Sequence, residues 1–367
     1  MKLIILKNYI KEGVSLAERV TGKNLTLPIL NNVLLIAEDN NLKLKATNLE
    51  IGVEVVLPAK VLKKGKISVS AQTLHNFISN LYSDDQVTIE SDGYNLSIVT
   101  KNTSTVIKGQ PTEDFPTFPV IQNKNEFSIS SQDLFFGLKS VWYAASISHI
   151  KPEISSVFMT QKNKEIKFVA TDSFRLAEKK IPFSLGVAPD TLIPYKSVIE
   201  IIRILDGKTG KAIIVADKDQ LSLKIDSVTF ISRLVDGIFP DYEQIIPKNI
   251  TTDVIIDKQV FVNSLKSAGI FLNKLNELCI LSGEDNKTII IKTSNTELGE
   301  HVAKIQVQKT GEDFNMVFNY KYVFDCLQYI PSEKVLLRFS GAGKPLIITG
   351  SDNSTFLYLV MSIHSSS

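Results

Sequence analysis

The stretch ATDSFRLAEKK, residues 170–180, holds the side chains that first suggest chemistry. Asp172 follows an alternating apolar run, at the point where a strand is expected to pass into a turn. A carboxylate at such a position can act as a general acid or base. It can equally bond its own backbone and shape the turn, as Asp and Thr side chains commonly do. A third interpretation is that Phe174, Arg175 and Leu176, just after the turn, face a partner.

Other catalytic motifs are absent from the sequence. The segment SGAGKP, residues 340–345, resembles a phosphate-binding loop, but that motif needs Gly where Arg338 stands and Ser or Thr where Pro345 stands. We therefore expect a turn between two strands there. The four His residues are scattered, and no GxGxxG, HExxH or GxSxG pattern occurs. We predict no catalytic residues, no cofactor and no metal site, so the protein is not expected to be an enzyme.

Composition points to a protein of a reducing compartment. The two cysteines, Cys279 and Cys326, stand in apolar surroundings without a CxxC spacing, which argues against disulfides and zinc. No apolar run approaches the roughly 18 residues that span a bilayer. The N-terminus, MKLIILKNYIKEG, is typical of a strand and not of a signal peptide. We expect a cytoplasmic protein with no membrane partner.

The elements that must position these residues recur three times along the 367 residues. Segments starting at Lys2, Glu126 and Asp253 each pair a short alternating strand with a run of helical period, and Gly13 matches Gly137 at an offset of 124. Segments starting at Ile67, Thr191 and Met316 repeat the pattern. We predict three copies of one α+β domain, each with two helices and antiparallel sheets, at residues 1–122, 123–250 and 251–367. The proline-bearing segments 110–125 and 235–249 are the expected linkers.

The repeats bear directly on Asp172. Thr47–Asn48 stands 124 residues before Thr171–Asp172, and Thr293–Ser294 is roughly equivalent in the third copy. A residue type shared by three copies is more simply structural than catalytic, so the turn interpretation is favoured. What distinguishes the middle copy is Phe174-Arg175-Leu176, which stands where the first copy has Glu50-Ile51-Gly52.

Basic residues are spread over the polar faces of the six predicted helices. Each is compatible with an ordinary solvated helix face. If the three copies present equivalent helices to one surface, however, their charges would attract a phosphate backbone without reading bases. The residues concerned are Lys11, Arg19, Lys139, Lys196, Arg203, Lys266, Lys274 and Lys321.

The segments TLPILNNVLLIA (26–37), ATDSFRLA (170–177), IPYKSVIEIIRIL (193–205), LVDGIFPDYEQIIP (234–247) and FLYLVM (356–361) resemble the bacterial DNA polymerase III beta subunit family, the replicative sliding clamps. The resemblance covers essentially the whole chain. It implies a DNA-clamp fold and a head-to-tail homodimeric ring that encircles duplex DNA without reading sequence. It also implies no catalysis, and partners that comprise the replicative DNA polymerase, the clamp loader and repair proteins, which bind through short peptides.

The resemblance further implies site residues, which we carry over by position. The partner-peptide groove would comprise Ile154, Thr171, Ser173, Phe174, Arg175, Leu176, Pro240, Ile245, Pro345, Leu359, Val360, Met361, Ser362 and Ile363. Lys23, His149 and Lys151 would join the DNA-contact set given above, and Ile270 and Phe271 would anchor the dimer interface. The family usually has Gly-His where Ser173–Phe174 stand, so the groove is expected to be bulkier here. The alternative is a purely structural role, in which Leu176, Ile245 and Val360 are ordinary core residues.

Two other classes of function stay open at this point. The first is an enzyme with a carboxylate site around Asp172 or Asp241, since such sites carry no sequence motif. The second is a peptide-binding scaffold that does not bind DNA.

Overall fold

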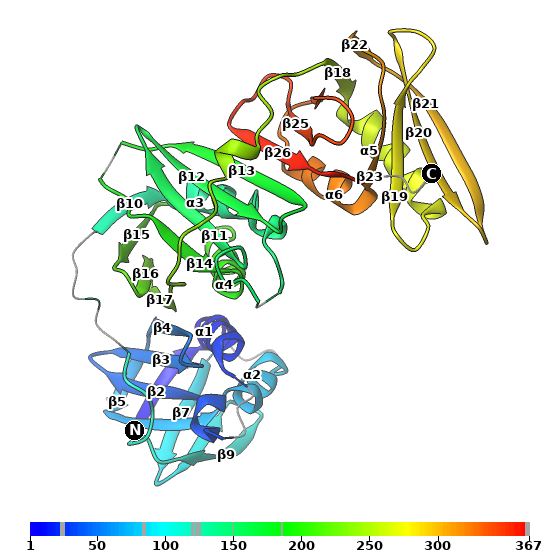
Figure 1. Cartoon of the computed structure of the whole chain (residues 1–367). Coiled ribbons are helices and arrows are strands. Elements are labelled where there is room, and N and C mark those ends of the chain that lie inside the picture. Colours follow the sequence, from blue (N-terminus) through cyan, green and yellow to red (C-terminus); the bar gives the residue numbers. More distant parts are fainter. Residues whose placement is uncertain are drawn as a thin grey trace. The chain divides into compact units, whose positions relative to one another are not determined.

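The computed structural model describes residues 1–22, 26–82, 86–118, 121, 126–148, 150–184 and 186–363 (Figure 1). The chain forms two compact units. One is made chiefly of Met1–Gln132 and Arg203–Leu234, and the other chiefly of Asp133–Ser184, Ala188–Ile202 and the chain from Val235 onwards. The α-helices of the described residues are α1 (Lys7–Val20), α2 (Ala71–Ser79), α3 (Ser131–Lys139), α4 (Tyr195–Leu205), α5 (Lys258–Ala268) and α6 (Tyr320–Asp325). None of them is long and apolar enough to cross a membrane.

The first unit contains one long antiparallel sheet. Its strand order is β10 (Glu126–Ser130), β15 (Lys211–Ala216), β16 (Gln220–Ile225), β17 (Val228–Arg233), β4 (Ile51–Pro58), β3 (Asn41–Thr47), β2 (Asn32–Glu38), β6 (Gly65–Ser70), β9 (Ser104–Gln110), β8 (Asn95–Val99), β7 (Gln86–Asp92), β1 (Lys2–Leu6) and β5 (Lys60–Lys63). The pairing of β17 with β4 joins strands from the first and second copies of the repeat.

The second unit contains two antiparallel sheets. The larger has the order β14 (Thr191–Pro194), β11 (Ser156–Lys162), β12 (Glu165–Thr171), β13 (Arg175–Pro182), β26 (Phe356–Val360), β25 (Leu346–Gly350), β24 (Lys334–Phe339), β18 (Thr252–Asp257) and β22 (Gln308–Gly311). The smaller has the order β21 (Gly299–Gln306), β20 (Thr288–Asn295), β19 (Glu277–Ser282), β23 (Asn315–Asn319) and β27 (Ser362–Ile363). Short 3-10 helices are η1 (Pro28–Asn31), η2 (Trp142–Ala144), η3 (Tyr242–Ile245), η4 (Gly269–Phe271) and η5 (Cys326–Tyr329).

The predicted repeat of strand and helix is confirmed at the level of elements. β1, β10 and β18 run directly into α1, α3 and α5, and β6, β14 and β23 run into α2, α4 and α6. Several of these junctions carry an N-cap side chain that accepts a backbone hydrogen bond. Ser70, Asp257 and Asn319 accept from the amides of Thr73, Val260 and Lys321 at 3.3, 2.9 and 3.0 Å. A cap at the strand end satisfies a free amide and starts the helix there.

The equivalence of Gly13 and Gly137 also has a physical reason. A Cβ atom on Gly13 would lie 2.8 Å from a methyl group of Leu57, and one on Gly137 would lie 2.4 Å from the ring of Phe168. Each helix therefore packs on its sheet at a distance that only glycine permits. Leu57 and Phe168 are themselves buried, so neither side chain can simply move into solvent.

The predicted turns and hairpins are present. β7 pairs with β8, β15 with β16, and β20 with β21, all as antiparallel hairpins. The SGAGKP segment joins β24 to β25, which pair from Arg338 opposite Ile347, so the turn interpretation of this segment is confirmed. The domain boundaries 1–122, 123–250 and 251–367 stay a prediction, because the two compact units divide the chain differently.

Replacing Gly137 by Ala should lower the free energy of unfolding by about 1–3 kcal/mol, because the methyl group has no space beside Phe168. Urea unfolding of both proteins measures the difference. Gln132→Ala, at an exposed position of the same helix, should stay within about 0.5 kcal/mol of the wild type. Equal stabilities of the wild type and Gly137→Ala would contradict the close packing.

Candidate functional site

The turn between β12 and β13 is built by the side chains of Thr171 and Asp172. The Thr171 hydroxyl donates to the carbonyl of Arg175 at 2.7 Å and accepts from the amide of Ser173 at 3.1 Å. One carboxylate oxygen of Asp172 accepts from the amides of Phe174 and Arg175, both at 3.0 Å. Ser173 has a φ of 78°, a left-handed conformation that these bonds hold in place.

The first copy builds the same turn with the same bonds. Thr47 donates to the carbonyl of Ile51 at 2.8 Å, and Asn48 accepts from the amides of Glu50 and Ile51 at 3.0 and 2.9 Å. Leu49 takes a φ of 75°, matching Ser173. The turn interpretation of Asp172 is therefore confirmed: its role belongs to the fold and is shared with an amide.

The third copy contains the same kind of turn, with the accepting side chain shifted by one residue along the chain. Asn295 accepts from the amides of Glu297 and Leu298 at 2.8 and 3.1 Å, whereas the Thr293 hydroxyl donates to the carbonyl of Ala268. The equivalent of Asp172 is thus Asn295 and not Ser294. The loop is one residue longer here, because Ser294 pairs with Glu300 where Thr171 pairs with Leu176.

The second oxygen of Asp172 belongs to an ion-paired group that we call the Arg175 clasp, made of Asp172, Arg175 and Asp325. Arg175 Nε lies 2.9 Å from Asp172 Oδ2, and its Nη1 lies 2.9 Å from Asp325 Oδ2 on α6. The guanidinium also lies over the ring of Tyr322, 4.5 Å from its centroid. Burial lowers the pKa of Arg175, but acidic neighbours led by Tyr358 and Asp172 outweigh it, so the pKa stands above its ordinary value. The clasp ties the turn to α6.

The end of the chain lies beside this turn. Residues Arg175–Lys179 of β13 pair with Phe356–Val360 of β26, with Arg175 opposite Val360 and Leu176 opposite Leu359. Beyond the ladder, the amide of Met361 donates to the carbonyl of Phe174 at 2.8 Å. The chain then crosses to the smaller sheet, where Ser362 and Ile363 pair with β23.

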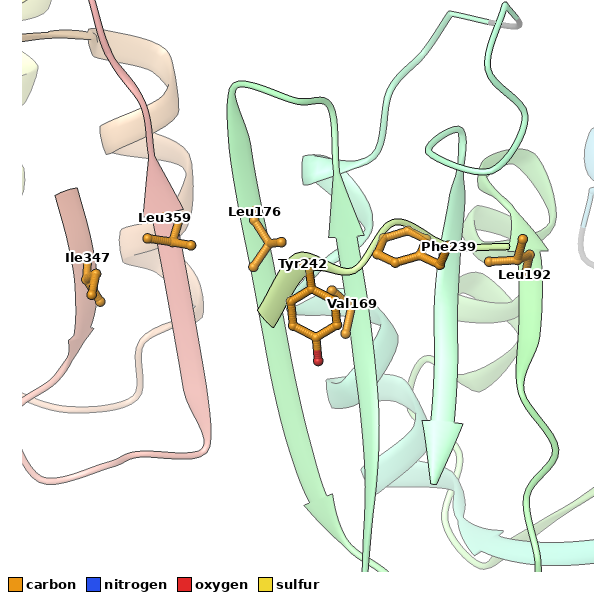
Figure 2. Close-up of a cluster of buried hydrophobic side chains, with 7 residues drawn as sticks. All are labelled: Val169, Leu176, Leu192, Phe239, Tyr242, Ile347 and Leu359. Atoms are coloured by element: carbon orange, nitrogen blue, oxygen red, sulfur yellow. The ribbon is translucent and has the colours of Figure 1, made fainter. Parts of the chain in front are cut away.

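A buried apolar cluster includes Leu176 and Leu359, two of the predicted groove residues (Figure 2). It draws side chains from three separate stretches: Val169, Leu176 and Leu192; Phe239 and Tyr242; and Ile347 and Leu359. Sequence reasoning placed 235–249 as a linker and missed that Phe239 and Tyr242 are core residues. We call residues 235–250 the strap. The FPDY pattern, with two aromatic residues three apart, was the available signal.

The structure sorts the predicted groove residues by exposure. Six of them are buried, namely Ile154, Thr171, Leu176, Pro345, Leu359 and Val360. The exposed ones are Ser173, Phe174, Pro240, Ile245 and Met361, and the half-buried ones are Arg175, Ser362 and Ile363. Leu176 and Val360 are therefore core residues in this structure, whereas Ile245 is 52% exposed and Phe174 is 61% exposed.

The described basic residues of the predicted DNA set lie at the surface or half-buried. Arg19 at the end of α1 and Arg203 at the end of α4 line one open depression of about 680 Å³ together with Asp206. Lys11, Lys196, Lys266 and Lys321 are exposed and make no ion pair within the described residues. Lys139 lies over the ring of Phe135, and Lys151 is exposed in a loop.

Lys274 was predicted on a helix, but α5 ends at Ala268 and η4 at Phe271, so it lies in the following loop. Lys23 and His149 lie outside the described residues.

The predicted dimer anchors stand next to an edge strand. Ile270 is 65% exposed, and Phe271 is half-buried with its ring stacked on His301 of β21 at 5.9 Å. β21 is the last strand of the smaller sheet, and Val302 on it is 52% exposed. Ile270 and Phe271 therefore offer apolar surface beside a strand edge that has no partner strand in the described chain, whereas Val302, the neighbour of His301, points to the opposite face of the sheet.

The structure also bears on a metal site and on the second carboxylate of the enzyme hypothesis. Within the described residues, no three His, Cys, Asp or Glu side chains lie close enough to hold a metal ion. Asp241, the other carboxylate considered, is exposed and accepts a hydrogen bond from the Gln244 side chain at 2.7 Å.

Comparison with known proteins covers the whole chain. Three family models match in order, described as the N-terminal, central and C-terminal domains of the DNA polymerase III beta subunit, at residues 1–119, 129–241 and 243–364. The chain is 26% identical to the beta sliding clamp of Chlamydia pneumoniae over 370 residues, which is 99% of this chain and 100% of that one. It is also 26% identical to the beta sliding clamp of Bacillus subtilis, over 99% of each chain.

Solved structures agree with the sequence comparison. The DNA polymerase III beta subunit of Thermotoga maritima is similar with a TM-score of 0.92 and 25% identity, over 99% of both chains. A sliding clamp of Pseudomonas aeruginosa bound to griselimycin is similar with a TM-score of 0.94 and 25% identity, again over 99% of both chains. The three-domain clamp architecture with antiparallel sheets is therefore confirmed.

The turn role of Asp172 predicts a graded response to substitution. Asp172→Ala removes the acceptor of two backbone amides and should cost about 1–3 kcal/mol of stability, whereas Asp172→Asn retains that acceptor, as Asn48 does, and should cost less. Urea unfolding measures both. Asp114→Ala, an exposed aspartate, serves as the control. Equal losses for the Ala and Asn variants would contradict the turn role.

Proposed function

The chain belongs to the DNA polymerase III beta subunit family, and on that premise we propose that two copies close head to tail into a ring around duplex DNA. Its function is that of a DNA sliding clamp, a non-catalytic processivity factor that keeps the polymerase on its template. The observation that carries the proposal is the match of all three domain models, in order, across residues 1–364. We propose domain boundaries at 1–122, 123–250 and 251–367.

The proposed ring follows from the repeat. A head-to-tail interface closes into a ring when the rotation between subunits divides the circle. Two copies of a threefold repeat give six similar units, each with two helices. If these helices line the hole, their exposed lysines and arginines face the DNA. A ring that holds DNA by topology needs only weak, sequence-independent phosphate contacts, and tight binding would hinder sliding.

The proposed contact to DNA is supported by the positions of Arg19 and Arg203, which line the same depression. These two residues come from different copies of the repeat, yet they line one depression on the first unit. Two guanidinium groups on one surface suit adjacent phosphate groups. Lys11, Lys196, Lys266 and Lys321, each exposed and without an ion pair in the described chain, extend the set. Lys139, Lys151 and Lys274 complete it among the described residues.

Partner proteins are proposed to dock short peptides at the groove residues around the β12–β13 turn. Phe174, Ile245 and Met361 supply exposed apolar surface there, and Ser173 and Ser362 supply polar groups at the rim. Apolar contacts with a few polar groups are the usual chemistry of peptide recognition. The proposed partners are the replicative polymerase, the clamp loader and repair proteins, in the cytoplasm.

The proposed subunit interface is supported by the exposed edge of β21. Ile270 and Phe271 offer apolar surface next to backbone groups that have no partner strand in the described chain. A strand of the second copy can complete that sheet, with the apolar side chains buried beside it.

Substituting the two arginines tests the contact to DNA. Arg19→Ala with Arg203→Ala should make the salt dependence of DNA binding shallower by about two, since each lost phosphate contact removes about 0.9 from the slope. Fluorescence anisotropy over a salt series measures it. Lys60→Ala with Lys63→Ala removes two exposed lysines on β5 and should leave the slope unchanged. An unaltered slope in the arginine variant would contradict the contact of these two residues with DNA, and a wild type that binds no DNA would favour a peptide scaffold.

Substituting Ile270 tests the ring. Ile270→Asp should convert the protein from a dimer of about twice 40.8 kDa into a monomer, because a charge would be buried in the apolar contact. Light scattering measures the mass. Ile238→Asp, at a position that is 90% exposed, should leave the dimer intact. A wild type that stays monomeric at high concentration would contradict the ring, and a dimeric Ile270→Asp variant would contradict this interface.

A further inference from the structure

The strap, residues 235–250, is held on the face of the sheet by more than apolar packing. At its start, the amide of Val235 donates to the carbonyl of Leu192 at 3.0 Å. Phe239 then stacks on Phe158 with ring centroids 5.1 Å apart. These contacts hold the first half of the strap. The second half, η3, carries Tyr242, whose ring lies over β12 and β13 beside Val169 and Leu176 (Figure 2).

A buried carboxylate lies under η3. The Glu178 side chain is 4% exposed, on the face of β13 that also carries Leu176. The hydroxyl of Tyr242 donates to its Oε2 at 2.5 Å. Lys167 Nζ lies 3.6 Å from the same oxygen, and Lys180 Nζ lies 3.5 Å from Oε1. Burial, followed by this bond to Glu178, raises the pKa of Tyr242, so the hydroxyl stays a donor at neutral pH.

Lys167 extends the network back to the strap. Its side chain is 11% exposed, and its Nζ lies 2.9 Å from Oε1 of Glu243, the residue after Tyr242. Lys162 meets the same carboxylate from the solvent side at 3.1 Å. Two adjacent strap residues, Tyr242 and Glu243, are therefore bonded to charged groups of β12 and β13.

A purely apolar contact would pack the strap at a lower desolvation cost. Burying a carboxylate and an ammonium group is costly, and an apolar pair of the same volume is often at least as stable. What the charged network adds is direction. A hydrogen bond to a fixed carboxylate sets the position of Tyr242 along the strands, whereas apolar side chains tolerate sliding.

The position of Tyr242 sets the positions of its neighbours in the strap. Pro240 and Ile245 stand two residues before it and three after it, and both are exposed on the predicted groove. We propose that Glu178 and Tyr242 are positioning residues for the peptide groove, which hold the strap so that Pro240 and Ile245 meet the docked peptide. This role rests on the groove of the proposed function and deepens it: it adds buried residues that no ligand touches.

Tyr242→Phe tests the role, because it removes one hydroxyl and keeps the ring. Griselimycin, the ligand bound to the similar clamp of Pseudomonas aeruginosa, serves as the probe, and its affinity is measured by calorimetry. We expect about tenfold weaker binding, with amide hydrogen exchange of residues 238–247 at least tenfold faster and the solution mass unchanged. Glu178→Gln retains an acceptor for Tyr242 and should lose less affinity than Glu178→Ala.

The matched control is Lys162→Ala, which removes the solvent-exposed ion pair of the same strap. Exposed pairs of this kind contribute little, so both affinity and strap exchange should equal those of the wild type. Wild-type affinity in Tyr242→Phe would overturn the positioning role, whether or not the strap exchanges faster. So would a loss of affinity without faster strap exchange. Failure of the wild type itself to bind griselimycin would instead remove the groove of the proposed function, and this role with it.

Discussion

The antiparallel pairing of β13 with β26 is the constraint on which the candidate site depends. It sets Arg175 opposite Val360 and Leu176 opposite Leu359, although about 180 residues of chain separate the partners. Because side chains alternate along a strand, this register sends Leu176 and Leu359 into the same buried cluster. A slip of one residue between the two strands would put Leu359 on the face opposite to Leu176. The hydrogen bond from Met361 to Phe174 extends the register beyond the ladder and fixes the last described turn of the chain.

The turn next to this strand pair has two roles: it closes a hairpin, and in the middle copy it also orients Arg175. In the first copy of the repeat, the side chains of Thr47 and Asn48 close a hairpin. In the middle copy, Thr171 and Asp172 close the same hairpin, and the spare oxygen of Asp172 holds Arg175. Arg175 in turn reaches Asp325 on α6. A carboxylate in place of an amide therefore couples the turn to the last third of the chain. Phe174, which is exposed in the same turn, accepts a backbone hydrogen bond from Met361.

Local sequence patterns predicted the helices and strands well. They did not predict contacts between side chains that are far apart in the sequence. Alternation and helical period identified every strand-to-helix junction of the repeat. The constant offset identified the turn role of Asp172 and the match of Gly13 with Gly137, whereas the close packing at Gly137 is seen only in the structure. The partners of Arg175 on α6, and the bond between Glu178 and Tyr242, join residues 64 to 150 apart, which no periodicity encodes. The strap was taken for a linker because it carries two prolines, although it also carries several apolar side chains. The sequence comparison matched Asp172 with Ser294 and not with Asn295, because the third copy has one extra loop residue and an alignment at a fixed offset does not detect an insertion.

The central claim is that a ring holds DNA by topology and not by affinity. The most direct measurement loads the protein onto a nicked circular plasmid with a clamp loader, isolates the complex, and then linearises the DNA with a single cut. We expect the protein to remain on the circle through a high-salt wash and to be lost once free ends exist. Protein that stays on the linear DNA, or that washes off the intact circle, would contradict it.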